Sequence, residues 1–169
     1  MNTNIKYWVC ALLVISSGLL GTLIPGGPIE TRNFSHIDPL ILGTFNTFLT
    51  SLAIGSLLIL YFVFKDMKWG FVASAICGAS YFLIYVLDLG KIFPVSPDAM
   101  PQMLFTIEIL GTIISLPLTF FGIRGFMNSD SNKATISKLY STNFVYLVFF
   151  AVLISVGIIT FATQSAMGS

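Results

Sequence analysis

The stretch LDLGKIFPVSPDAMPQMLFTIEILG, residues 87–111, joins two long apolar runs through a loop that contains three prolines. It carries three of the seven acidic residues of the chain, and one of them, Glu108, lies in an otherwise apolar segment of membrane-spanning length. An ionisable group within a span costs roughly 2.5 kcal/mol or more unless it is paired, protonated or hydrated. Glu108 is therefore the residue that most needs a functional explanation.

The composition of the chain lies outside the range of soluble domains. Hydrophobic residues make up 56% of the 169 residues, charged residues make up 9%, and the mean hydropathy is +0.92. A typical soluble domain has roughly 25% charged residues. These values predict an all-α, polytopic integral membrane protein with a single helical bundle domain over residues 1–169. The net charge of +1, with no dense Lys/Arg run, excludes nucleic acid as a partner.

Five apolar runs are long enough to cross a bilayer, which takes about 20 residues. The first follows Lys6 and has no small-residue cleavage site after it, so we expect it to be retained. Asp38 and Pro39 precede the second and are favoured residues for a helix N-cap and first helical position. The five predicted transmembrane helices cover residues 7–24, 40–64, 69–87, 103–123 and 139–161.

The basic residues predict how the chain is oriented. With the N-terminus in the cytoplasm, six of the eight Lys and Arg residues fall inside, and only Arg32 and Lys91 fall outside. Cytoplasmic loops of membrane proteins carry such an excess. Five spans then place the C-terminus outside. The expected location is the cytoplasmic (inner) membrane, with a thylakoid or organellar membrane as the alternative.

Polar and small residues recur at steps of three or four on the second, third and fourth spans, so each span has one polar face. Such faces often serve only to pack helices closely. At about 1.5 Å per residue, however, the polar groups of all three faces reach the outer half of the membrane. We therefore expect an outward-facing polar pocket covered by the first loop, residues 25–39. Its expected residues are Glu108, Asp88, Tyr85, Tyr81, Asn46, His36 and Arg32.

The two outer loops also hold cations that bear on these acids. Arg32 or Lys91 is expected to neutralise Asp88 or Glu108. Alternatively, Arg32 pairs locally with Glu30 on the surface, where such a pair contributes about 0 to 1 kcal/mol. Neither Cys10 nor Cys77 forms a metal-binding pattern, and the chain has one histidine. No metal site is predicted, and the sequence identifies no cofactor.

Three functions are compatible with these features, and the sequence matches no catalytic motif. The preferred hypothesis is a non-catalytic accessory subunit that binds a partner through the pocket and the outer loops. Besides the bilayer, the expected partners are another protein or a second copy of the chain, and a lipid, quinone or pigment ligand. The second hypothesis is a small oligomeric transporter or channel with Glu108 as the ion- or proton-responsive group. The third is an outer-leaflet enzyme that modifies a lipid or quinone, with Asp88 and Glu108 as acid and base and His36 as helper.

Overall fold

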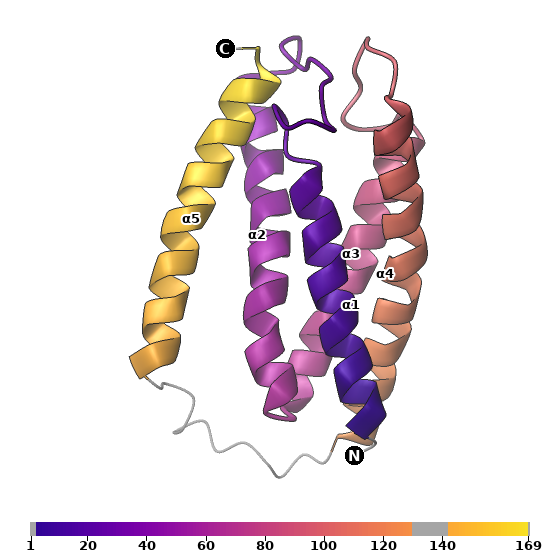
Figure 1. The fold of residues 1–169 in the computed structure, drawn as a ribbon, viewed down its shortest axis with the longest axis vertical. Coiled ribbons are helices and arrows are strands. Elements are labelled where there is room, and N and C mark those ends of the chain that lie inside the picture. Colours follow the sequence, from indigo (N-terminus) through magenta and orange to yellow (C-terminus); the bar gives the residue numbers. More distant parts are fainter. Residues whose placement is uncertain (1–2, 130–141, 169) are drawn as a thin grey trace.

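The computed structural model describes residues 3–129 and 142–168, and these residues form helices and no strand. All five helices are long and apolar enough to cross a membrane, and they form one elongated bundle (Figure 1). The all-helical prediction with five potential spans is thus confirmed. The helices are α1 (Thr3–Thr22), α2 (Pro39–Phe64), α3 (Lys68–Leu89), α4 (Gln102–Asn128) and α5 (Thr142–Ala166).

The helix bounds differ from the predicted spans mainly in length. Helix α4 continues past the expected end at Ile123 to Asn128, and α5 continues past Phe161 to Ala166. Hydropathy marks where the apolar segment ends, whereas a helix can project beyond it. Helix α1 ends at Thr22, before the expected end, because Pro25 follows closely. The expected start of the fifth span, residues 139–141, lies outside the described residues.

Local sequence signals explain the turns that join α1, α2 and α3. The Asp38 side chain accepts a hydrogen bond from the backbone N–H of Leu40 at 2.8 Å and caps α2, with Pro39 in the first turn, as predicted. Between α2 and α3 the chain turns at Asp66, which has a φ of 57°. The Nζ atom of Lys6 lies 3.2 Å from the carboxylate of Asp66, which joins α1 to this turn.

Helices α3 and α4 form the most closely packed pair in the bundle. A Cβ atom added to Gly78 would lie 2.7 Å from the backbone nitrogen of Thr119. One added to Gly122 would lie 2.7 Å from the backbone nitrogen of Ala75. Glycine is therefore needed at both positions for this approach. Helix α1 packs against α2, α3 and α4, whereas α2 is the only helix that packs against α5 in the described part of the chain.

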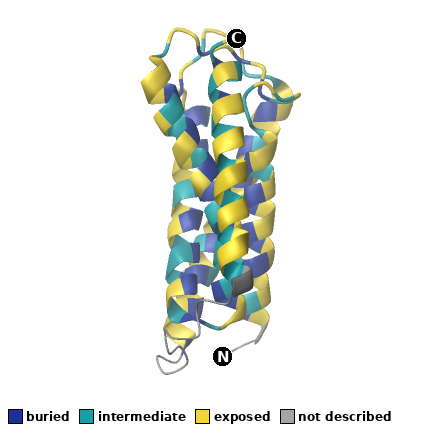
Figure 2. Cartoon of the chain, turned by 90° about the vertical axis from the view of Figure 1, so that its left-hand side faces the viewer, coloured by how far each residue is buried: buried dark blue, intermediate teal, exposed yellow. Residues whose placement is uncertain are grey.

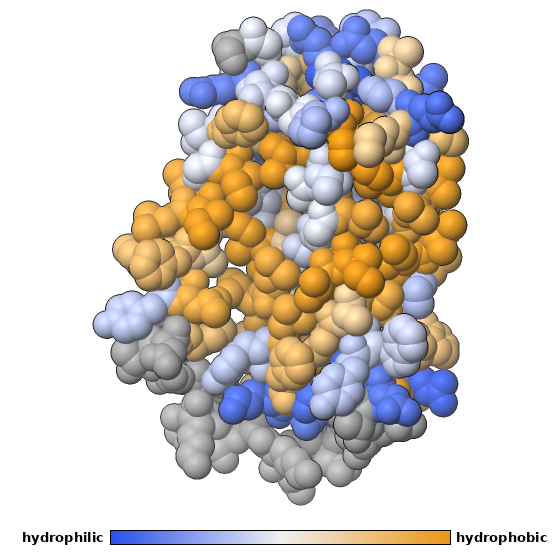
Figure 3. All heavy atoms as spheres, in the orientation of Figure 1, coloured by the Kyte–Doolittle hydropathy of each residue, from blue (hydrophilic) through white to orange (hydrophobic). Residues whose placement is uncertain are grey.

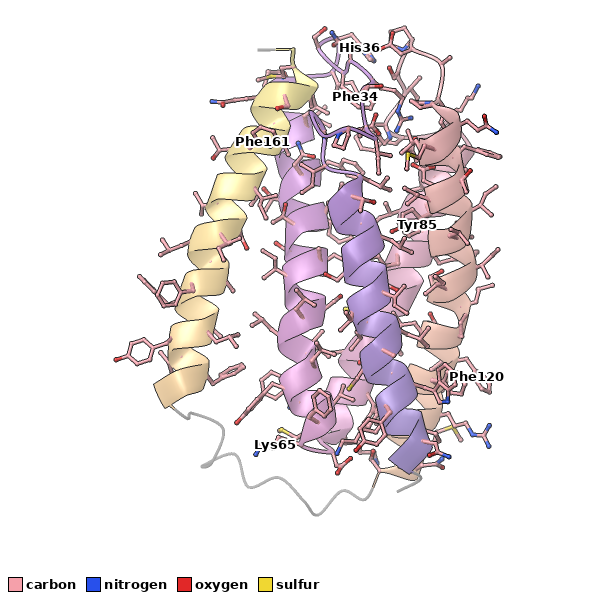
Figure 4. The ribbon with its side chains drawn as sticks, in the orientation of Figure 1. Phe34, His36, Lys65, Tyr85, Phe120 and Phe161 are labelled. Atoms are coloured by element: carbon pink, nitrogen blue, oxygen red, sulfur yellow. The ribbon has the colours of Figure 1, made fainter. Side chains whose placement is uncertain are left out.

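The exposure of each helix follows from how it packs against the others. Figure 2 shows α5 facing the viewer with many exposed residues along its length, and few residues of its apolar segment are buried. Figure 3 shows a broad apolar belt between two polar ends. His36 lies at one end and Lys65 at the other (Figure 4). We call the end with residues 23–38 and 90–101 the loop end.

Candidate functional site

The first loop, residues 23–38, folds over the loop end and is attached to α5. Its backbone is left-handed at Gly26, with a φ of +83°, and a Cβ atom there would lie 2.5 Å from the Ser165 side chain. The backbone N–H of Phe34 donates to the carbonyl of Ala166 at 2.9 Å. The side chain of Phe34 is buried against Leu42 and Ala166. These contacts hold the first loop across the bundle.

The second loop, residues 90–101, holds the first loop from the other side. The Oγ atom of Ser96 donates to the carbonyl of Asn33 at 3.0 Å, and the backbone N–H of Asn33 donates to Asp98 Oδ2 at 2.7 Å. Pro101 occupies the N-cap of α4, so Asp98 does not cap that helix and joins the two loops instead. The two loops therefore form a single cover.

Arg32 reaches down from this cover to two carboxylates. Its Nε and Nη2 atoms donate to Glu30 at 2.9 and 2.6 Å, and its Nη1 and Nη2 atoms donate to Asp88 at 2.8 and 2.7 Å. Burial alone would lower the pKa of Arg32, but the hydrogen bonds to Asp88 and Glu30 outweigh it and raise that pKa above its ordinary value. Of the two cations expected to neutralise Asp88 or Glu108, Arg32 is the one that pairs with Asp88. The pair with Glu30 is buried, contrary to the surface pair expected from the sequence.

Glu108 lies beside this ion pair. It is 1% exposed, and its Oε2 atom has no hydrogen-bond partner in the described part of the chain. Its carboxyl is within hydrogen-bonding reach of Asp88 and feels the charges of Arg32 and Glu30. We call these four residues, Glu30, Arg32, Asp88 and Glu108, the charged cluster. The cluster has three carboxyls and one guanidinium, so two positive charges, from cations or protons, are needed to balance it.

The charged cluster forms one wall of a cavity of about 50 Å³ beneath the loops, which we call the polar pocket. One water molecule needs roughly 10–15 Å³ of such space, so the polar pocket can take a small polar group. Asn46 of α2 and Tyr85 of α3 also line it, and Figure 4 shows Tyr85 inside the bundle below the loops. The remaining walls are mostly apolar, formed by Leu20, Leu23, Phe34, Leu42, Phe45, Leu49 and Ile84.

Two polar atoms in the polar pocket have no partner within the described residues. Besides Glu108 Oε2, the hydroxyl of Tyr85 is buried without a hydrogen bond. A buried polar group without a partner costs about 1–3 kcal/mol. The Tyr85 ring rests on Gly111, where a Cβ atom would overlap it, so the ring cannot easily turn toward α4. An acceptor and a donor are thus fixed within one cavity.

The structure brings together five of the seven residues expected at the site: Asn46, Tyr85, Asp88, Glu108 and Arg32 all line the polar pocket. Tyr81 is fully buried lower on α3, where its hydroxyl donates to Ser56 Oγ at 3.0 Å, and it does not line the pocket. His36 is exposed on the first loop, away from the pocket.

Glu30 also lines the polar pocket, although the sequence suggested it only as a surface partner of Arg32. Residues i and i+2 point to the same side of an extended segment, so Glu30 can accompany Arg32 into the pocket. The described residues contain no group of three His, Cys, Asp or Glu side chains that could hold a metal ion. The residues that line the polar pocket offer hydrogen-bonding groups, charges and apolar side chains.

A family model described as a domain of unknown function (DUF8051) matches residues 5–138. The match covers α1 to α4, both loops and the whole charged cluster, while α5 lies beyond it. No curated protein and no solved structure matches the chain.

Proposed function

The chain belongs to the DUF8051 family, and we propose that it is a non-catalytic membrane protein that binds an amphipathic, lipid-type molecule in the polar pocket. Its five helices cross the cytoplasmic membrane, with the N-terminus inside and the loop end outside. Lys6, Lys65 and Lys68 lie at the end of the bundle away from the loops, which supports this orientation. Lys133 and Lys138, two further basic residues expected inside, lie outside the described residues.

The unpartnered Oε2 atom of Glu108 is the observation that carries the proposal. A buried acceptor that only packs the bundle would be expected to have a partner, because unsatisfied buried polar groups are rare. Here the Oε2 atom lacks a partner, and Glu108 lines a cavity with leucine and phenylalanine walls. A ligand with a polar head and an apolar body satisfies both kinds of wall, and such mixed lining is typical of small-molecule sites.

The same contacts count against an enzyme that uses Asp88, Glu108 and His36. Each carboxylate oxygen of Asp88 accepts a hydrogen bond from Arg32, so proton transfer to Asp88 would compete with this ion pair. His36 is exposed and does not line the polar pocket, so it cannot assist there. Activity on a lipid or quinone that survives in a double Asp88→Ala, Glu108→Ala variant would end the enzyme hypothesis; activity that is lost in it would favour an enzyme over a binding protein.

Native mass spectrometry tests the proposal on protein extracted from its membrane in a mild detergent. We expect the wild type to retain a lipid-sized mass and Glu108→Gln to retain about tenfold less, because a hydrogen bond to a charged group contributes about 1.5–3 kcal/mol. Tyr81→Phe is the matched control, since Tyr81 is a buried polar residue on α3 outside the polar pocket, and it should retain as much as the wild type. A wild type without bound mass, or equal retention by Glu108→Gln, contradicts the proposal.

A transporter or channel would use the same carboxyl differently. Ion or proton flux in liposomes that depends on Glu108 would favour transport, and flux unchanged by Glu108→Gln would remove Glu108 from such a mechanism. We expect no Glu108-dependent flux, because the polar groups deeper in the bundle are hydroxyls that bond within it, such as Tyr81 to Ser56 and Ser74 to the carbonyl of Gly70.

A further inference from the structure

An apolar opening leads from the polar pocket to the side of the bundle. Helices α1 and α5 do not pack against each other, and two further cavities, of about 180 and 430 Å³, lie between them. The first shares Leu20, Leu23, Pro25, Asn46 and Leu49 with the polar pocket. The second shares Gly21, Ile24 and Ile158 with the first. We call these two cavities the side crevice.

The walls of the side crevice are almost wholly apolar. Leucine, isoleucine, alanine, glycine and proline line it from α1, α2, α5 and the first loop, with Ser17, Thr22, Asn46 and Thr50 as the polar exceptions. Its outer rim is exposed at Gly21, Thr22, Pro28 and Phe161. Its outer part has a volume within the roughly 300–1,000 Å³ of small-molecule sites. An apolar chain would thus enter from the side, between α1 and α5.

The charge of the polar pocket, at the inner end of the side crevice, selects the head group of the ligand. The three carboxyls and one guanidinium of the charged cluster leave negative charge in excess, and the hydrogen bonds of Arg32 go to Glu30 and Asp88. Glu108, whose Oε2 atom is a buried acceptor without a partner among the described residues, lines the polar pocket. An anionic head would be repelled here, and the described carboxyls do not form a metal site. An organic ammonium matches both the charge and the acceptor.

We propose that the polar pocket and the side crevice together bind a hydrocarbon chain that ends in a primary ammonium, with the ammonium on Glu108 and the chain between α1 and α5. This inference rests on the proposed function and specifies its ligand. Two sources supply a primary ammonium attached to hydrocarbon: a free long-chain amine, in which the two are joined directly, and a membrane phospholipid with an ethanolamine head, in which a phosphate and a glycerol lie between them.

The crevice contains two glycines suited to a test. A Cβ atom added to Gly21 or Gly157 meets nothing within 4 Å, and both glycines line the side crevice. Gly21→Leu and Gly157→Leu should therefore fill the crevice without displacing the backbone. Gly18→Leu is the matched control, because Gly18 lies one turn earlier on α1, is equally free of neighbours and lines none of the three cavities.

The experiment reconstitutes each variant in nanodiscs of phosphatidylethanolamine, of phosphatidylglycerol with the same chains, or of phosphatidylglycerol with added hexadecylamine. Native mass spectrometry then measures the retained molecule. The wild type and Gly18→Leu should retain phosphatidylethanolamine or hexadecylamine at least about tenfold more than phosphatidylglycerol. Gly21→Leu and Gly157→Leu should lose most of this retention. Retention of the lipid or of the amine identifies the source.

The outcomes separate this inference from the proposed function. If Glu108→Gln loses retention while Gly21→Leu and Gly157→Leu keep it, ligand binding stands and the side crevice is excluded. If the wild type retains phosphatidylglycerol equally well or better, the ammonium assignment is overturned. If the wild type retains none of the three molecules and no lipid from its own membrane, both the inference and the proposed function fail.

Discussion

Tyr81 and Tyr85 stand one turn apart on α3, and both rings are buried, but only the hydroxyl of Tyr81 has a partner. Tyr81→Phe should lower the free energy of unfolding by about 1 kcal/mol, the typical contribution of one hydrogen bond. Tyr85→Phe should leave stability unchanged or raise it, because it removes an unsatisfied group. It should nevertheless weaken ligand retention. Thermal unfolding in detergent ranks the two variants; a larger loss for Tyr85→Phe would mean that its hydroxyl serves the fold.

Arg32 provides a second prediction at the scale of single residues. Arg32→Ala leaves the buried carboxylates of Glu30 and Asp88 without their cation and should lower the free energy of unfolding by about 3–5 kcal/mol. Arg32→Lys should recover only part of this, because an ammonium cannot form the two-pronged contacts. The control is Lys91→Gln, which removes an exposed positive charge at the same end and should change stability by no more than about 0.5 kcal/mol. Equal effects of Arg32→Ala and Lys91→Gln would refute the buried ion pair.

The packing of α3 on α4 gives a prediction at the scale of helices. Gly122→Ala puts a methyl group 2.7 to 2.9 Å from the backbone of Ala75, so the helices must separate. Overpacking of this kind costs about 1–3 kcal/mol. Gly55→Ala adds the same methyl group to α2 where nothing lies within 4 Å, and alanine is the better helix former. Unfolding in detergent should show Gly122→Ala below the wild type and Gly55→Ala at or above it; the reverse order would contradict the close α3–α4 contact.

The helices were predictable from the sequence because hydropathy and spacing act locally. The Asp38 cap and the inward faces of α3 and α4 follow from residues within a few positions of each other. The contacts of the loops were less predictable. The backbone N–H of Asn33 donates to Asp98 across the two loops, and Arg32 joins Glu30 of the first loop to Asp88 of α3. Nothing in the spacing of such distant residues specifies which loop atoms will meet.

The residues of the candidate site were predicted only in part from the sequence. Helix position predicted that Asn46, Tyr85 and Glu108 lie in the outer half of the membrane, because the rise per residue is fixed in a helix, and all three line the polar pocket. It could not separate Tyr81 from Tyr85, because a single turn decides whether a side chain meets Ser56 or the polar pocket. The side crevice was also beyond sequence reasoning, since it depends on α5 packing on α2 and not on α1.

The orientation of the whole molecule can be tested with introduced thiols. Cys10 and Cys77 are buried, so the wild type should react little with a membrane-impermeant maleimide. Ser35→Cys, on the exposed first loop, should be labelled in intact cells, whereas Lys65→Cys should be labelled only after the cells are permeabilised. Labelling in the opposite pattern would reverse the proposed topology and put the polar pocket on the cytoplasmic side.

The most direct test of ligand binding is an experimental density map of the protein in nanodiscs made from its own membrane. We expect elongated density that starts within hydrogen-bonding distance of Glu108 Oε2 and runs between α1 and α5. A well-resolved pocket in which Glu108 pairs with a protein side chain, with no density beyond that of the protein and ordered water, would contradict it.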